Sequence, residues 1–219
     1  MTEQSLTPIQ KERLPLESQQ HATKTQKWLI GILLVILLAF VGSYLYLNHY
    51  YSRSATTNRF VTAIEQNDSK TVSSLIRTDD PDFKVTPHSV QPLMAYYQNH
   101  PNQRAKLKRR MAATGVVNGV LDFVDTGHHF FIFEKYLLEV KPIFPTINAN
   151  QDNTQVKINN QIVAKSLNKN VTRTFGPYIP GRYNIVMTSN NHEKTKMVSR
   201  TFEWIDPSPQ SLHVQENFK

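Results

Sequence analysis

Five positively charged residues fall within one short stretch of the chain and could bind an anion. They are Arg104, Lys106, Lys108, Arg109 and Arg110. Guanidinium and ammonium groups form charge-assisted hydrogen bonds with phosphate. At helical spacing these side chains fall into pairs one turn apart, while Leu107 and Met111 face inward. A run of charges is usually an ordinary solvated helix face, and the hypothesis set beside it is a polyanion-binding face formed by these five residues.

Other residue types that carry out chemistry are absent or unsuitably spaced. The chain of 219 residues has no cysteine, which excludes disulfides, thiolate-bound zinc or iron–sulfur sites and a thiol nucleophile. It has no hydrolase elbow, P-loop or dinucleotide fingerprint. His128 and His129 are neighbours in a predicted strand, so their side chains point to opposite faces and cannot bind one metal ion together. We therefore predict no catalytic residue, cofactor or metal site, and expect a protein that is not an enzyme.

A long apolar segment divides the chain. Residues Trp28–Leu47 are predominantly apolar, and no charged residue occurs between Lys27 and Arg53. A helix of this length rises about 30 Å, which is the thickness of the hydrocarbon core of a bilayer. The run is too long for the apolar region of a cleaved signal peptide. The sequence therefore predicts a single transmembrane helix over residues 28–47.

The charges that flank this segment predict its orientation. Lys and Arg are more frequent before it than after it, with Lys11, Arg13, Lys24 and Lys27 on one side and Arg53 and Arg59 on the other. The positive-inside rule then places the N-terminus in the cytoplasm. Residues 1–27 are polar and have no apolar period, so we predict a disordered cytoplasmic tail. The remainder is predicted to be extracellular.

The exterior part begins with a helical pattern. Residues 55–113 predict a small bundle of short helices that must be held together by packing. The clearest signal is an apolar stripe at i, i+3, i+4 and i+7, formed by Val90, Leu93, Met94 and Tyr97. Pro101 can open the next helix, which carries the five cations.

The pattern changes near Gly115, so the overall prediction is an α+β fold. Residues 115–206 are rich in β-branched and aromatic residues and predict a β-rich domain, with a small antiparallel β-sandwich over about residues 142–206. Asn159-Asn160 suits a hairpin turn, and Pro180-Gly181 suits the centre of a type II turn. Residues 207–219 are expected to be a loose C-terminal tail.

Three segments carry a resemblance to a known family. Lys135–Gln161, Phe175–Met187 and the helical stretch Val85–Pro101 resemble the TcaA-like, teicoplanin-resistance-associated membrane proteins of Gram-positive bacteria. The resemblance implies a single-pass membrane protein whose exterior part takes part in the cell-envelope response to glycopeptide antibiotics, without enzyme activity. Such proteins usually begin with a four-cysteine zinc ribbon and continue into further exterior domains. This chain has no cysteine and ends soon after Asp206, so we expect it to lack both.

These observations favour a non-catalytic, membrane-anchored envelope protein that acts by binding. The part after the apolar segment has 21 Lys and Arg against 14 Asp and Glu, a net charge of +7. This charge suits teichoic acids and anionic lipid headgroups. Nucleic acid is not expected, because the basic stretch is predicted to lie outside the cell. The alternative is an accessory or regulatory subunit that docks another envelope protein through the edge strands of the β-rich domain.

Overall fold

The computed structural model describes residues 24–117, 120–191, 194–206, 208 and 212–216. The disordered tail predicted for residues 1–27 lies almost entirely outside this range. The chain divides into two compact units, one ending at Leu45 and one beginning at Tyr46. Each is described by itself.

The first unit contains most of one long helix, α1 (Lys24–Tyr50). Its large apolar side chains are exposed all along its length, as an environment of lipid tails requires. Residues Thr25–Tyr50 are long and apolar enough to cross a membrane, and no other helix in the described part of the chain meets this criterion. The predicted transmembrane segment 28–47 lies within this helix.

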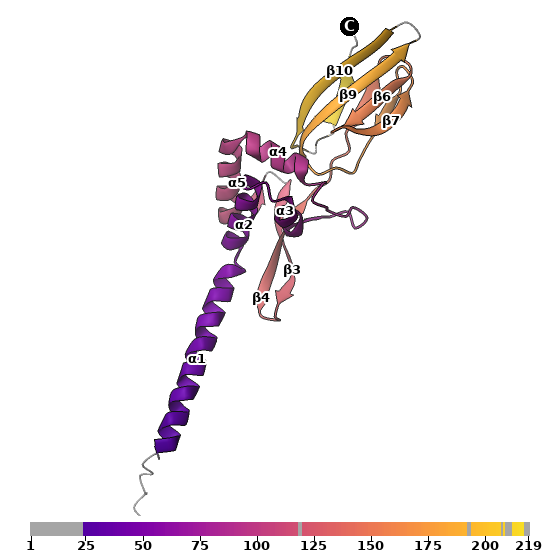
Figure 1. The fold of residues 1–219 in the computed structure, drawn as a ribbon. Helices are drawn as coiled ribbons and strands as arrows, with labels where there is room; N and C mark the ends of the chain where they lie inside the picture. Colours follow the sequence, from indigo (N-terminus) through magenta and orange to yellow (C-terminus); the bar gives the residue numbers. More distant parts are fainter. Residues whose placement is uncertain (1–23, 118–119, 192–193, 207, 209–211, 217–219) are drawn as a thin grey trace, which may run out of the picture. The chain divides into compact units, whose positions relative to one another are not determined.

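The second unit begins with helices packed on a four-stranded sheet, which we call the helix–sheet domain (Figure 1). Its helices are α2 (Arg53–Glu65), α3 (Ser69–Leu75), α4 (Gln91–Asn99) and α5 (Pro101–Ala113). Its strands, in their order across the sheet, are β1 (Ile76–Thr78), β4 (Phe133–Val140), β3 (Leu121–His129) and β2 (Val116–Val117). The pairing of β1 with β4 is parallel, and the other two pairings are antiparallel.

Local sequence explains where these helices begin and which face they bury. The Ser52 hydroxyl accepts a hydrogen bond from the backbone N–H of Ala55 at 3.2 Å and caps α2. Asp68 caps α3 in the same way, as its carboxylate accepts from the N–H of Thr71 at 3.1 Å. Pro101 occupies the first position of α5. The predicted apolar stripe of α4 is buried, and it contributes Val90, Leu93, Met94 and Tyr97 to the core.

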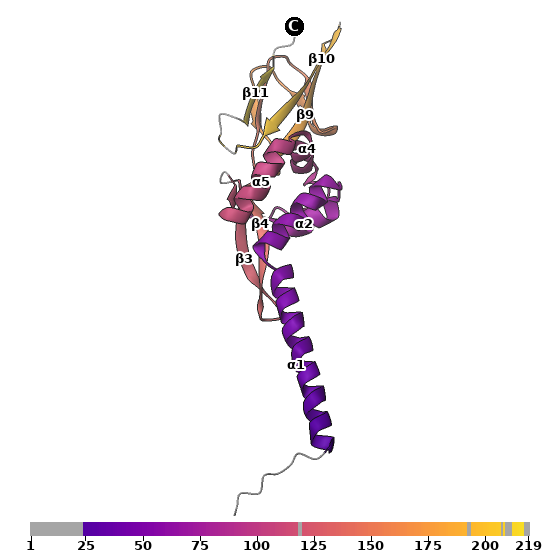
Figure 2. The ribbon, with the colours of Figure 1, turned by 90° about the vertical axis from the view of Figure 1, so that its left-hand side faces the viewer.

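The rest of the described chain forms the β-sandwich module, residues 143–216 (Figure 2). Its strands are β5 (Thr146–Ala149), β6 (Thr154–Ile158), β7 (Gln161–Leu167), β8 (Thr172–Thr174), β9 (Gly181–Asn191), β10 (Lys194–Trp204) and β11 (His213–Glu216). The antiparallel sheet β10-β9-β6-β7 and the mixed sheet β11-β5-β8 enclose a second core, which contains Ile147, Ile185 and Trp204. The prediction of an α+β fold with an antiparallel-rich sandwich is confirmed.

The two cores group the strands differently from the sequence prediction. The strands between residues 115 and 140 share a core with the helices, because Leu121 and Leu138 belong to the same buried cluster as Phe60 and Leu93. The tail predicted to be loose, residues 207–219, is described at residues 208 and 212–216 and lies otherwise outside the described residues. Its described part contains β11, which pairs with β5 in parallel and buries Val214. Pairing with a strand far back in the sequence therefore holds β11 in place.

The junction between domain and module explains a glycine that the sequence analysis assigned to a turn. Gly181 is the first residue of β9 and does not adopt the positive φ that a type II turn requires. A Cβ atom on Gly181 would lie only 2.2 Å from the carbonyl carbon of Pro92 in α4. Just before it, Ile179 is fully buried in the core of the helix–sheet domain. Gly181 is therefore required for close contact between β9 and α4.

Candidate functional site

The five predicted cations all lie on α5, and four of them are exposed to solvent. These four are Lys106, Lys108, Arg109 and Arg110, which we call the basic face. The helix holds them outward because Leu107 and Met111, each 1% exposed, are packed into the core on its other side. α5 carries no acidic residue, and basic side chains near its last turn complement the partial negative charge at a helix C-terminus.

Arg104 differs from the other four. Its Nε atom lies 3.1 Å from a carboxylate oxygen of Glu65 in α2, and its Nη1 donates a hydrogen bond to the carbonyl of Tyr97 at 3.1 Å. These contacts join α5 to α2 and α4, and the Arg104 side chain is only 21% exposed. The structure therefore gives Arg104 an internal partner and leaves the basic face to the other four residues.

The basic face extends around two flanks of α5. Lys106 and Arg110 line a small cavity of about 210 Å³ together with Tyr96 and Gln103. Lys108 lies on the opposite flank. Among the ion pairs found within the described residues, none involves Lys106, Lys108 or Arg109. An exposed cation without a carboxylate partner can contact an external phosphate without first breaking an internal ion pair.

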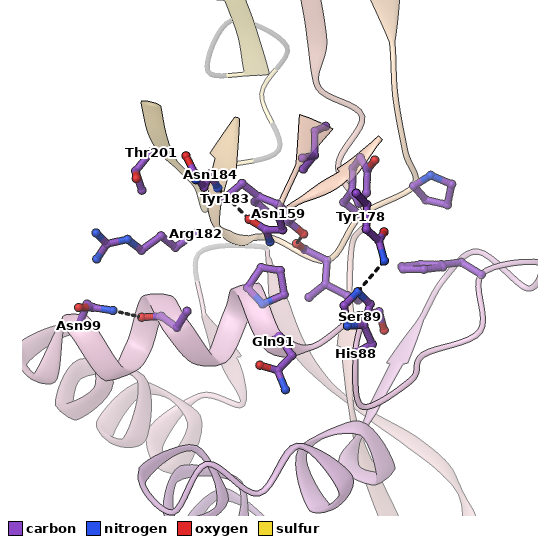
Figure 3. Close-up of a pocket in the computed structure, with 17 residues that line it drawn as sticks. His88, Ser89, Gln91, Asn99, Asn159, Tyr178, Arg182, Tyr183, Asn184 and Thr201 are labelled. Carbon is purple, nitrogen blue, oxygen red and sulfur yellow. Dashed lines mark hydrogen bonds between the residues drawn. The ribbon is translucent and has the colours of Figure 1, made fainter. Parts of the chain in front are cut away.

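A second candidate site, a groove of about 590 Å³, lies between α4 and the β-sandwich module (Figure 3). Its lining combines amides, hydroxyls and apolar side chains. The polar part includes Ser89, Gln91, Asn99, Asn159, Gln161, Arg182, Asn184 and Thr201, and the apolar and aromatic part includes Phe83, Ala95, Ile158, Tyr178 and Ile179. No residue in this lining carries a carboxylate.

Polar groups of the groove are held in place by hydrogen bonds to their neighbours. The Gln161 and His88 side chains are 3.0 Å apart, so the β6–β7 turn contacts the segment before α4 (Figure 3). The Asn159 side-chain oxygen accepts from the backbone N–H of Asn184 at 2.8 Å. Burial raises the pKa of the Tyr178 hydroxyl, which is already neutral at physiological pH at its ordinary value. Such a lining suits a neutral polar ligand with many hydrogen-bonding groups, such as a peptide or a glycan.

The two neighbouring histidines at the end of β3 differ in their surroundings. The His129 ring stacks on Tyr51 with ring centroids 4.3 Å apart, and His128 is exposed. Within the described residues there is no cluster of three or more His, Cys, Asp or Glu side chains that could hold a metal ion.

Sequence reasoning found the basic face but missed the groove. The cations are adjacent in sequence, whereas the groove brings together Phe83, Asn99, Gln161 and Thr201, from distant segments. The one local signal was the pair Pro180-Gly181, which marks the close approach of β9 to α4. Amides scattered along a polar sequence give no such signal.

Comparison with known proteins identifies one matching family model and one similar membrane protein. A family model described as the TcaA protein second domain matches residues 53–140, from the start of α2 to the end of β4. The chain is also similar to the membrane protein YvbJ of Bacillus subtilis (strain 168), with 24% identity over 137 residues. This match covers 63% of the chain and 23% of YvbJ, so the chain spans less than a quarter of that relative. No solved structure matches the chain.

Proposed function

We propose that the chain is a non-catalytic binding protein of the cell envelope. Its match to the TcaA second-domain model over residues 53–140 and its similarity to the membrane protein YvbJ support this proposal. In this proposal α1 is the single membrane anchor, with the N-terminus in the cytoplasm and the helix–sheet domain and β-sandwich module outside. The ligand is a phosphate-bearing polyanion of the envelope, such as wall teichoic acid, and the basic face of α5 binds it. The binding serves the response to glycopeptide antibiotics.

One observation carries this proposal: four exposed cations gather on a helix that has no acidic residue. Arg and Lys bind phosphate groups by charge and by directed hydrogen bonds. Teichoic acid and anionic lipid share this phosphate chemistry, so the test must separate the two sources.

The test uses the full chain in nanodiscs and purified wall teichoic acid as the probe. In discs of phosphatidylcholine alone, replacing all four basic-face residues with Gln should lower the affinity about tenfold or more at low salt. The wild-type affinity should fall steeply as salt rises, because salt screens exposed charges. Adding phosphatidylglycerol to the discs shows whether lipid phosphate competes with the polymer for the same residues.

A matched control removes the same amount of charge elsewhere. Lys84, Lys165, Lys169 and Lys196 are exposed and lie outside α5. Replacing them with Gln should change the affinity little if the basic face is the site. Equal losses in the two variants would instead show that diffuse net charge attracts the polymer, and would refute a site on α5.

The proposed orientation can be tested separately because the chain has no cysteine. A single cysteine at exposed Lys165 should react in intact cells with a maleimide that cannot cross membranes. A single cysteine at Lys11 should react only after the cells are opened. The reverse pattern would refute the orientation, and with it an extracellular ligand.

The groove favours a second candidate function, the docking of another envelope protein. It lies beside β7, an edge strand of its sheet, and edge strands can pair with a partner's backbone. A photoreactive amino acid at Gln91, within the groove, should then give a discrete crosslinked product in cells, whereas one at exposed Lys84 should not. Identical products at both positions would argue against a docking site in the groove.

A further inference from the structure

The hairpin formed by β3 and β4 ends in an exposed apolar turn. Phe130 is 69% exposed, Phe131 is 99% exposed and Ile132 is 62% exposed. The hairpin extends away from the β-sandwich module, so that this turn lies at the opposite end of the second unit (Figures 1 and 2). These three adjacent apolar side chains are therefore not stabilised by burial in the protein core.

The backbone of this turn is unfavourable for the residues that occupy it. Phe130 and Phe131 have φ values of 51° and 64°, and the N–H of Ile132 donates to the carbonyl of His129 at 3.2 Å. These are the features of a type I′ turn, which favours Asn and Gly because side chains with a bulky Cβ substituent are strained at positive φ. Two phenylalanines at positions that strain their backbone suggest that these side chains have a function other than stabilising the fold.

The same chain contains a turn of this geometry with ordinary residues. In the β6–β7 hairpin, Asn159 and Asn160 have φ values of 47° and 66°. Asn tolerates this region of backbone conformation. The comparison shows that the β3–β4 turn could be built from polar residues without changing its backbone.

The apolar turn lies next to the residues at the end of the candidate membrane span. The candidate span ends at Tyr50, and Tyr51 stacks on His129 and lies 5.8 Å from Phe133, measured between ring centroids. Ile132 lines a cavity of about 570 Å³ together with Asn48 and Tyr51. Since Tyr51 directly follows the span, the chain connection itself keeps this end of the hairpin near the bilayer surface.

The surroundings of Tyr51 have the composition of a membrane interface. Arg59 lies over the ring of Tyr50 at 4.5 Å, and Arg53 lies over the ring of Tyr136 at 4.9 Å. Tyrosine rings and basic side chains are enriched at the level of lipid headgroups, where the rings lie partly in apolar surroundings and the cations contact phosphate.

From the exposure, the strained turn and the contact with Tyr51, we propose that Phe130, Phe131 and Ile132 insert into the lipid surface that α1 exits. The partner is the bilayer itself, contacted at the boundary between headgroups and acyl chains. The hairpin thus provides a second membrane attachment, besides α1, for the second unit. This inference does not depend on the ligand of the basic face or on the orientation of the chain.

The absence of cysteine makes a direct test possible. The full chain carrying Phe131→Cys is labelled with a nitroxide and reconstituted in vesicles of phosphatidylcholine with some phosphatidylglycerol. The label should be relaxed more by oxygen, which concentrates in lipid, than by a water-soluble nickel complex. Met197→Cys in β10, where Met197 is 68% exposed, is the control and should show the opposite preference.

Two results of this experiment would overturn the proposal. A label at residue 131 that the nickel complex reaches as readily as the label at residue 197 would place the turn in water. A label shielded from both reagents would show that a protein surface covers the turn, either a second copy of the chain or another protein.

A second variant separates lipid contact from folding. Phe130→Asn with Phe131→Asn reproduces the turn at Asn159 and Asn160, so its melting temperature should equal or exceed that of the wild type. A nitroxide at residue 132 should change from lipid-exposed to water-exposed in this background. If the label stays in lipid without the two phenylalanines, they are not the inserting residues and the proposal fails.

Discussion

Replacing Gly181 with Ala should push the β-sandwich module away from the helix–sheet domain. The added Cβ would lie 2.2 Å from the carbonyl carbon of Pro92 and 2.4 Å from the backbone nitrogen of Leu93, where ordinary contacts begin at 3.4 Å. Both neighbours are backbone atoms at the start of α4 and cannot rotate out of the way. Relief of the clash therefore requires β9 and α4 to move apart by roughly 1 Å.

The loss of stability caused by Gly181→Ala can be estimated from the known costs of two other kinds of core substitution. Overpacking a well-packed core costs about 1–3 kcal/mol. Separating β9 from α4 would also loosen Ile179, whose complete truncation to Ala in a core costs about 2–5 kcal/mol. We expect a loss of about 3 kcal/mol for Gly181→Ala. In a protein of this size that lowers the melting temperature by about 6–12 °C.

Tryptophan fluorescence during thermal unfolding of the full chain in detergent would measure this loss. Trp204 pairs with Gly181 in the β9–β10 register and is 1% exposed, so it reports on the junction. Trp28 is replaced by Phe in every variant so that Trp204 alone gives the signal. Gly42→Ala is the control, because no atom lies within 4 Å of its added Cβ. A melting temperature for Gly181→Ala equal to that of the control would refute the close junction.

Three further predictions follow from side chains whose partners are known. Arg104→Gln should lower the free energy of unfolding by about 1 kcal/mol yet leave polyanion affinity nearly unchanged, as parallel melting and binding titrations would show. The pKa of Asp68 is lowered by hydrogen bonds at the start of α3, so its stabilisation is present above pH 4 and is lost as the pH falls below about 4; Asp68→Asn should flatten this part of a stability–pH curve. The pKa of His129 is lowered mainly by burial, and further by the nearby positive charges of Lys135 and Arg59. Stability should therefore fall as the pH drops through about 6.5, and His129→Gln should remove that fall in melting temperature.

Features set by local pattern were predictable from the sequence. The membrane segment followed from length and the absence of charge, because both are properties of consecutive residues. The buried stripe beginning at Val90 followed from helical periodicity, and the Asn159-Asn160 turn followed from the tolerance of Asn for positive φ.

Features set by partners distant in sequence were not predictable. Arg104 and Lys108 look alike one turn apart on α5, yet only Arg104 meets a carboxylate, because Glu65 on α2 is brought to it by packing. Ile76 continues an apparent helical pattern after Val72, but it pairs with Leu138 of β4 and begins strand β1. In both cases a tertiary contact decides between two states that local pattern leaves nearly equal.

The two proposed contacts meet at one end of the helix–sheet domain. Ala112, one turn beyond Lys108 on α5, lines the same cavity as Asn48, which belongs to the candidate span near its exit. If the β3–β4 turn inserts into lipid as proposed, headgroups would lie close to Lys108, whereas Lys106 and Arg110 lie on the opposite flank beside their own cavity. Phosphate from lipid and phosphate from a wall polymer are then expected to compete mainly at Lys108. Replacing Lys106 and Arg110 should accordingly weaken polymer binding more than lipid contact. In this proposal, phosphate of the polymer contacts the flank of Lys106 and Arg110, whereas phosphate of lipid contacts the flank of Lys108.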